Sequence, residues 1–206
     1  MMLKVKCAVF GRLDNNCYLI TDEKSGKSAL VDCTEDSERM RDFIGDADVK
    51  YILLTHGHFD HIGGVKGIKE LTGAEIVISR EDAPMLGSGK LSLAAFCGEH
   101  QINAAADMEV TDGDIIHLGE SEIKVMSTPG HTKGGVCYIC EDKLFTGDTL
   151  FYCSCGRTDF PGGSGSEIIE SLKRLAALKG AYIVYPGHDR QSTLDFERKN
   201  NPYMNR

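Results

Sequence analysis

The stretch that most constrains this chain is Thr-His-Gly-His-Phe-Asp-His, at residues 55–61. It places four side chains that can bind a metal ion within six residues: His56, His58, Asp60 and His61. Imidazole and carboxylate groups are the donors that zinc and similar divalent ions take in proteins. The whole chain has only 7 histidines, so three of them in one short run indicate a metal site rather than chance.

The neighbours of this run predict where it lies in a fold. Residues 51–54 are an unbroken apolar stretch that predicts a buried strand, and the glycines at 63 and 64 predict a turn into a helix. We therefore expect the four side chains on a loop at the carboxyl end of a strand, where α/β proteins usually place their sites. One loop cannot complete two coordination spheres, so further ligands must come from elsewhere in the chain.

Length and composition predict one α/β domain over residues 1–206. A chain of 206 residues is long enough for one sizeable core and too short for two. With 41% hydrophobic and 26% charged residues it has the composition of an ordinary globular protein. It has no apolar span of membrane-crossing length, and its amino end lacks the apolar centre of a signal peptide. We therefore expect a cytoplasmic protein without a membrane partner.

Charge and cysteine content exclude two further classes. A net charge of -8 disfavours nucleic-acid partners, whose binding depends on lysine and arginine. The 8 cysteines are expected as reduced thiols, because a chain of this size does not need a disulfide framework. Cys137 and Cys140 lie three residues apart in a predicted strand, so they face opposite sides of a sheet and are interpreted as packing residues.

The remaining pattern alternates strands and helices. Residues 5–32 predict a meander of three strands, followed by a helix with Thr34 as its N-cap. Residues 81–109 have no clear periodicity and are either a substrate-shaping lid or a plain surface insertion. After them we expect further strands at 115–118, 123–127, 136–141 and 143–146, a helix at 166–178 and a last strand at 182–185.

Three later residues repeat the setting of the first run. His131, Asp148 and His188 each follow a predicted strand and each has a glycine directly before it. A small neighbour lets the backbone approach an ion closely and turn sharply afterwards. The total is then seven ligands, which suits two metal ions of about four ligands each only if one carboxylate is shared. Asp148 is the natural bridge, because a carboxylate has two oxygens.

Taken together, the Thr-His-Gly-His-Phe-Asp-His, Pro-Gly-His-Thr, Gly-Asp-Thr and Pro-Gly-His motifs resemble those of the metallo-β-lactamase fold superfamily. The resemblance implies a four-layer αββα sandwich with a metal site at the edge between its two sheets. It implies two divalent ions, expected to be zinc, with iron and manganese as alternatives. The implied ligands are His56, His58 and His131 for the first ion and Asp60, His61 and His188 for the second, with Asp148 and a hydroxide between them.

A second set of motifs resembles particular branches of that superfamily. Leu150-Phe151 followed by Cys155-Gly156-Arg157-Thr158-Asp159 is similar to hydroxyacylglutathione hydrolases (glyoxalase II) and to persulfide dioxygenases. Residues 159–164 and 201–203 most resemble compact, single-domain glyoxalase II-like hydrolases. Classical glyoxalase II has a helical carboxyl-terminal domain that contacts glutathione, and we expect this chain to lack it. The common zinc β-lactamases carry cysteine where this chain has Asp148, which argues against that activity.

We therefore expect a dinuclear metal-dependent hydrolase that cleaves a small-molecule thioester. A bridging hydroxide, oriented by Asp60, would attack the carbonyl, and a thiolate leaves without a dedicated general acid. The main alternative is a mononuclear iron dioxygenase that oxidises glutathione persulfide and uses most of the same ligands. A β-lactamase, a phosphodiesterase and a non-catalytic relative are the less favoured alternatives.

Three residues outside the ligand set are further candidates. Cys155 and Arg157 follow the bridging aspartate closely and are candidate substrate contacts. The competing interpretations are packing for Cys155 and a structural ion pair with Asp159 for Arg157. Asp32, at the end of an apolar strand, is either a hydrogen-bond acceptor for a ligand imidazole or an acidic cap on the next helix.

Overall fold

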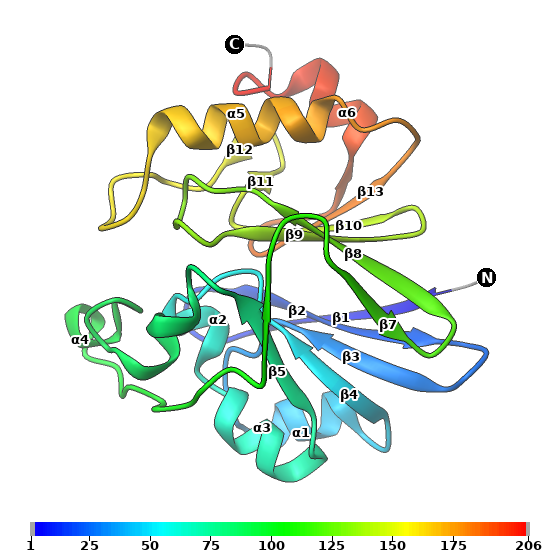
Figure 1. Ribbon diagram of the computed structural model, residues 1–206, viewed down its shortest axis with the longest axis vertical. Coiled ribbons are helices and arrows are strands. Elements are labelled where there is room, and N and C mark those ends of the chain that lie inside the picture. Colours follow the sequence, from blue (N-terminus) through cyan, green and yellow to red (C-terminus); the bar gives the residue numbers. More distant parts are fainter. Residues whose placement is uncertain (1–2, 205–206) are drawn as a thin grey trace.

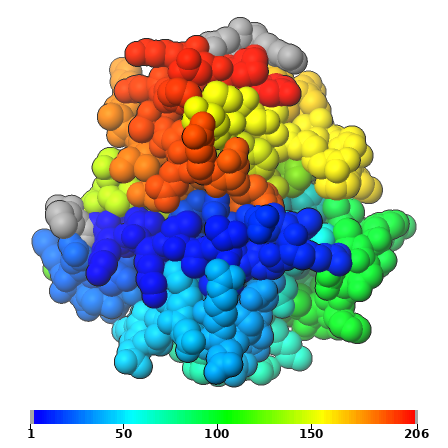
Figure 2. Space-filling model, turned by 180° about the vertical axis from the view of Figure 1, so that it is seen from behind, coloured from blue at the N-terminus to red at the C-terminus, as the bar shows by residue number. Residues whose placement is uncertain are grey.

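The computed structural model describes residues 3–204, which form two six-stranded sheets packed face to face with helices on both outer sides (Figure 1). The space-filling view from behind shows the amino-terminal strands as a blue band between the carboxyl-terminal segments above and residues near 40–50 below (Figure 2). This arrangement confirms the expected four-layer αββα sandwich. Within residues 3–204, every helix is too short or too polar to traverse a bilayer.

The first sheet has the strand order β1-β2-β3-β4-β5-β6. Its strands are β1 (Leu3–Phe10), β2 (Asn15–Asp22), β3 (Lys27–Val31), β4 (Asp48–Leu53), β5 (Glu75–Ser79) and β6 (Met108–Val110). The first three are antiparallel, and β3 to β6 run parallel. Parallel neighbours need crossover connections, and α1 (Glu38–Ile44) and α3 (Val65–Thr72) supply two of them on the outer face.

The second sheet has the order β14-β13-β10-β9-β8-β7. Its strands are β7 (Ile115–Leu118), β8 (Ser121–Ser127), β9 (Val136–Cys140), β10 (Lys143–Gly147), β13 (Ile183–Pro186) and β14 (Ser192–Thr193). Helices α5 (Gly165–Ala176) and α6 (Leu194–Asn200) cover its outer face. Short elements complete the chain: α2 (Phe59–Ile62), the 3-10 helix η1 (Ala83–Gly87), α4 (Ala94–Cys97) and the ribbon of β11 (Leu150–Phe151) and β12 (Ser154–Cys155).

Two buried tyrosines join the sheets across the shared core. The hydroxyl of Tyr18, in the first sheet, donates to the carbonyl of Pro186 in the second at 2.6 Å. The hydroxyl of Tyr138, in the second sheet, donates to the carbonyl of Leu54 next to the first at 2.9 Å. Each accepting carbonyl lies where a strand passes into a histidine-bearing loop. These two hydrogen bonds therefore fix the positions at which the two loops leave the sheets.

The structure corrects several local expectations. The N-cap of α1 is Ser37 and not Thr34: the Ser37 hydroxyl accepts a hydrogen bond from the Met40 backbone N–H at 3.1 Å, and the Thr34 hydroxyl lies 3.3 Å from the Cys17 sulfur. The expectation that residues 56–61 form only a loop is also wrong, because residues 59–62 form the short helix α2. The predicted helix at 166–178 begins at residue 165 and ends at residue 176.

The cysteine interpretation is confirmed. Each of the eight cysteines is a free thiol. Cys137 packs under α5 and α6 in the outer core of the second sheet, whereas Cys140 packs in the core between the sheets. The two therefore face opposite sides of β9, as the spacing predicts.

Candidate metal centre

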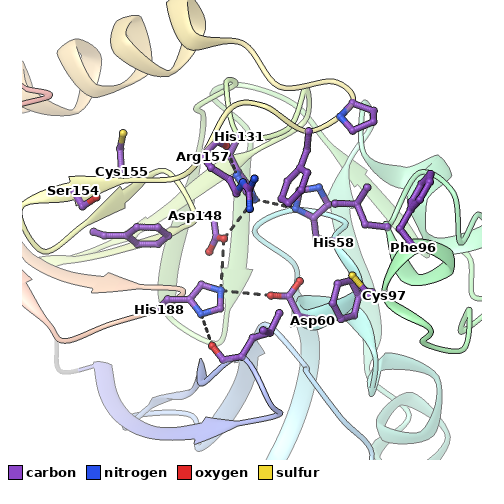
Figure 3. Close-up of a pocket in the computed structure, with 16 residues that line it drawn as sticks. His58, Asp60, Phe96, Cys97, His131, Asp148, Ser154, Cys155, Arg157 and His188 are labelled. Atoms are coloured by element: carbon purple, nitrogen blue, oxygen red, sulfur yellow. Dashed lines mark hydrogen bonds and ion pairs between the residues drawn. The ribbon is translucent and has the colours of Figure 1, made fainter.

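The seven predicted ligands meet at one edge of the sandwich, although they span residues 56–188 of the chain. His56 and His58 lie on the loop after β4, and Asp60 and His61 lie on α2. The second sheet supplies His131 between β8 and β9, Asp148 after β10 and His188 after β13. Figure 3 shows the side chains of His58, Asp60, His131, Asp148 and His188 pointing toward a common centre. The site therefore lies between the two sheets and draws on both.

The potential donor atoms form three overlapping groups in which all atoms lie within 4.8 Å of one another. The groups are His56, His58 and His131; His56, His61 and Asp148; and Asp60, His61 and His188. In the first, His58 Nδ1 lies 2.9 Å from His131 Nε2, and in the last, His188 Nε2 lies 3.5 Å from Asp60 Oδ2. At these separations, two such atoms either share one proton or bring two lone pairs together.

Asp148 contacts histidines from both outer groups. Its Oδ1 lies 3.3 Å from His61 Nε2, and its Oδ2 lies 3.4 Å from His131 Nε2 and 3.6 Å from His188 Nε2. Gly187 makes this approach possible, because a Cβ at that position would lie 2.4 Å from Asp148 Oδ1. The two carboxylate oxygens thus face two neighbouring groups of nitrogen atoms.

The donor atoms fit metal ions better than they fit one another. Three of them are buried and make no hydrogen bond of good geometry within residues 3–204: His56 Nε2, His61 Nε2 and Asp148 Oδ1, the last two facing each other at 3.3 Å. A buried polar atom without a partner costs about 1–3 kcal/mol, so such atoms require an explanation. Divalent cations bind imidazole nitrogen and carboxylate oxygen directly, and they would also relieve the repulsion among the lone pairs.

Backbone carbonyls fix the orientation of two of the imidazoles. His131 donates its Nδ1–H to the carbonyl of Arg157 at 2.7 Å, and His188 donates its Nδ1–H to the carbonyl of Leu13 at 2.9 Å. When Nδ1 carries the proton, Nε2 keeps its lone pair. In both rings that lone pair faces the centre of the cluster, which is the tautomer a metal ion requires.

Asp32 holds a third imidazole. Its Oδ2 lies 2.9 Å from His61 Nδ1, and its carboxylate also accepts from the backbone N–H of Thr55 at 2.8 Å and from the Thr55 hydroxyl at 2.9 Å. The same hydroxyl lies 3.1 Å from His56 Nδ1. Asp32 does not cap the next helix, which has Ser37 as its N-cap.

Two residues near the cluster were missed by the sequence reasoning. The buried carboxylate of Asp82 accepts from Gly57 N at 3.1 Å, from the Thr132 hydroxyl at 2.7 Å and from Gly134 N at 2.8 Å, and so joins two histidine loops. The amide of Asn15 donates to Asp60 Oδ2 at 2.9 Å. Neither residue belongs to a recognisable motif, so only the tertiary structure reveals them.

Burial sets the protonation of the first group. It lowers the pKa of His56 well below the usual range, and the nearby His61 and His58 rings lower it further. Burial, followed by the charge of His131, lowers the pKa of His58 to about 3. Both rings are therefore neutral at pH 7 and have a free lone pair for a metal ion.

Carboxylates set the protonation of the second group. Burial disfavours a charged His61, but Asp148, Asp32 and Asp60 outweigh it and raise its pKa well above the usual range. Burial likewise acts to raise the pKa of Asp60 and Asp148, and the nearby histidines outweigh it and lower both values. Both carboxyl groups are therefore ionised at neutral pH, and His61 is protonated until a metal ion takes the place of its Nε2 proton.

A cavity of about 710 Å³ opens above the cluster. The two predicted substrate contacts, Cys155 and Arg157, line it. The irregular segment at 81–109 contributes Leu93, Phe96 and Cys97 to the opposite wall, and Figure 3 shows Phe96 and Cys97 across the site from Cys155. The Arg157 guanidinium also forms the ion pair with Asp159 that the sequence suggested, at 2.6 Å.

Comparison with known proteins gives a consistent family. A family model described as Metallo-beta-lactamase superfamily matches residues 10–188. A protein of Aquifex aeolicus is 36% identical over 204 residues, covering 97% of this chain and 96% of the relative. The hydroxyacylglutathione hydrolase GloC of Haemophilus influenzae is 34% identical over 197 residues, covering 92% of each.

Solved structures agree with this result. The B3 metallo-β-lactamase BLEG-1 superposes with a TM-score of 0.91 at 28% identity, covering 98% of this chain and 99% of the other. ETHE1 from Myxococcus xanthus gives 0.80 at 29% identity, with coverage of 98% and 84%. TTHA1623, solved in a di-iron-bound form, gives 0.86 at 29% identity, with coverage of 97% and 100%. The resemblance found in the histidine and aspartate motifs is confirmed.

Proposed function

The chain belongs to the metallo-β-lactamase superfamily, and we propose that it is a dinuclear metal-dependent hydrolase that cleaves a thioester. The observation that carries the metal assignment is the set of buried, unpartnered nitrogen and oxygen atoms that converge from both sheets. We assign His56, His58 and His131 to one ion, Asp60, His61 and His188 to the other, and Asp148 to both. When bound, such a pair of divalent ions lowers the pKa of bound water toward about 7 and polarises a carbonyl oxygen.

Asp60 has the position and charge to orient the attacking water. Its carboxylate is ionised, and the Asn15 amide holds Oδ2 at 2.9 Å. Oδ1 then remains available to accept a hydrogen bond from the attacking water and to orient it. Because the Asn15 amide holds the other carboxylate oxygen, this acceptor is preorganised.

A thioester suits this site because its leaving group needs little help. A thiolate has a conjugate-acid pKa of about 8.5, so it leaves without prior protonation, whereas an amine requires a general acid. The lining outside the proposed ligands contains no carboxylic acid, lysine or tyrosine among residues 3–204. The Haemophilus influenzae relative is named as a hydroxyacylglutathione hydrolase, which supports the same reaction class.

The experiment is a thioester assay on protein whose metal content is measured in the same sample. We expect about two zinc ions per chain, consistent with the two ligand groups, and release of free thiol detected by a chromogenic reagent. Asp60→Asn should lower kcat by at least about 10²-fold, because the attacking water loses the carboxylate that orients it. The matched control is Asp42→Asn, which changes an exposed carboxylate on α1 and should leave the rate unchanged. Wild-type rates in Asp60→Asn would contradict the role given to this residue.

Oxidation of a persulfide by a single iron is a second candidate. The resemblance of residues 150–159 to persulfide dioxygenases supports it. It predicts one iron per chain and oxygen uptake with glutathione persulfide. The hydrolase predicts no oxygen uptake with any substrate, so an oxygen electrode separates the two.

A further inference from the structure

The wall of the cavity above the cluster is strongly apolar. Four of the 8 phenylalanines of the chain line it: Phe59, Phe96, Phe151 and Phe160. Leu13, Leu93 and Pro161 add to them. Half of the phenylalanines therefore gather at one site, and burial against an apolar lining favours an apolar group of the ligand.

The apolar side chains come from both halves of the sandwich and flank the reactive centre. Phe96 rises from α4 and is 68% exposed, and Leu13, at the turn after β1, is 47% exposed. On the other side the Phe160 ring centroid lies 5.7 Å from that of His58, and the Phe151 ring centroid lies 6.0 Å from that of His188. Apolar groups therefore reach from the solvent to the proposed metal ligands, and a substrate would cover their exposed surface.

Among residues 3–204, this wall offers no free positive charge outside the proposed ligands. Arg157 is the only lysine or arginine that this part of the chain contributes to the lining. Its guanidinium makes two 2.6 Å hydrogen bonds to the Asp159 carboxylate and lies 4.1 Å from the Phe160 ring centroid. Arg12, on the turn after β1, is similarly paired with Glu99 at 3.0 Å. The carboxylates of glutathione, or the phosphates of a nucleotide thiol carrier, would find no unpaired cation in this cavity.

From these observations, and resting on the thioester hydrolysis proposed above, we infer that the substrate carries an apolar acyl group, an alkyl or aryl chain of several carbons. The acyl group occupies the phenylalanine-lined cavity, and the polar end of the thiol carrier extends into solvent. Phe96 forms part of the acyl-binding wall. A small hydroxyacyl group, which would place a hydroxyl against aromatic carbon, is a poorer substrate.

The test is a series of thioesters that share one uncharged thiol, N-acetylcysteamine, and differ only in the acyl group. Each kcat/KM is divided by the rate of hydroxide-catalysed hydrolysis, which removes differences in carbonyl reactivity. From acetyl to butyryl to hexanoyl we expect a rise of about two- to fourfold per methylene, the scale for partial to full burial. Isobutyryl and lactoyl groups have nearly the same shape, and we expect the isobutyryl thioester to be preferred. The lactoyl thioester of glutathione should be cleaved less well than the hexanoyl compound.

Two variants locate the preference. Phe96→Ala should reduce the hexanoyl-to-acetyl ratio of kcat/KM by at least about threefold, because one wall of the acyl site is lost. Leu71→Ala is the matched control, since Leu71 is also an exposed hydrophobic residue, at 53%, but lies on α3 outside the cavity lining. It should leave both rates unchanged.

The possible outcomes separate the inference from the function on which it rests. If thioesters are cleaved but the rates are flat or fall with chain length, or lactoyl is preferred to isobutyryl, the apolar acyl group is wrong and the hydrolase stands. An unchanged ratio in Phe96→Ala removes this residue from the acyl site. If the metal-loaded protein cleaves no member of the series, the thioester function and the inference both fail.

Discussion

Replacing Asp32 with asparagine tests how the chain prepares a histidine for metal binding. The residue is buried and has a φ of +58°, in the left-handed region that asparagine tolerates about as well as aspartate. The variant therefore keeps the size and the backbone of the wild type. It changes only the hydrogen bonds to His61 and Thr55.

The geometry gives two possible arrangements of the new amide. If the amide oxygen replaces Oδ1, it still accepts from the Thr55 N–H, a bond of 2.8 Å in the wild type, and the NH₂ group then faces His61 Nδ1. His61 must then accept at Nδ1 and carry its proton on Nε2, the atom that faces Asp148 at 3.3 Å. If the amide oxygen instead replaces Oδ2, the NH₂ group faces the Thr55 N–H, and one buried donor loses its acceptor.

Either arrangement weakens the site. The first blocks the lone pair of His61, and the second leaves a buried donor unsatisfied, which costs about 1–3 kcal/mol. Loss of a hydrogen-bond partner behind a metal ligand typically lowers metal affinity about 10- to 100-fold, equivalent to about 1.4–2.8 kcal/mol. We expect a loss in this range for at least one of the two zinc ions.

The assay is competition for zinc against a chromophoric chelator, with urea unfolding of the metal-free protein measured in parallel. Asp22→Asn is the control, since Asp22 is a buried carboxylate that bonds Ser25 and the backbone N–H of Glu120 but touches no histidine. It should lose stability and keep zinc affinity. Unchanged affinity for both zinc ions in a folded Asp32→Asn protein would refute the reasoning.

Three further predictions concern stability. Tyr138→Phe should lower the free energy of unfolding by about 1–2 kcal/mol, because the buried Leu54 carbonyl loses its 2.9 Å donor; urea titration checks it, and an unaltered midpoint would mean that this bond is dispensable. Asp82→Ala should lower the free energy of unfolding by about 3 kcal/mol or more, since three donors from the two histidine loops lose a buried acceptor. Thermal unfolding and turnover check it, and a variant as stable and active as the wild type would contradict it. The Ser25 hydroxyl and the Glu120 N–H lower the pKa of Asp22 to about 2, below its unfolded value of about 3.9. The contribution of Asp22 to the stability of the fold is therefore present above about pH 4 and lost as the pH falls toward 2. The stability difference between wild type and Asp22→Asn should shrink over that range, and a constant difference would contradict the assignment.

The sequence predicted which candidate metal ligands would meet better than it predicted the residues that hold them in place. His131, Asp148 and His188 were found because histidine and aspartate after strand ends are rare enough to recognise, and the structure brings them to the first run of ligands. The fold followed from the same motifs through a family resemblance. Strand order alone was compatible with the sandwich without demanding it.

The parts that escaped the sequence are those that depend on tertiary neighbours. Asp82 lies in a segment without periodicity, and its bonds reach Gly134, 52 positions along the chain. The four phenylalanines of the cavity come from α2, α4, β11 and the loop before α5, and no short window of sequence contains more than two of them. The N-cap at Ser37 was missed for a local reason, since Thr34 offers the same hydroxyl three residues earlier.

The measurement that tests the central claim most directly is the number of zinc ions per folded chain after equilibrium dialysis. Zinc is determined by elemental mass spectrometry and divided by the protein concentration of the same sample. The account predicts about two zinc ions per chain in the wild type, from the two ligand groups that share one carboxylate, and no more than one tightly bound ion in His131→Ala. A folded wild-type chain that retains one ion or fewer, or a His131→Ala variant that still binds two, would contradict it.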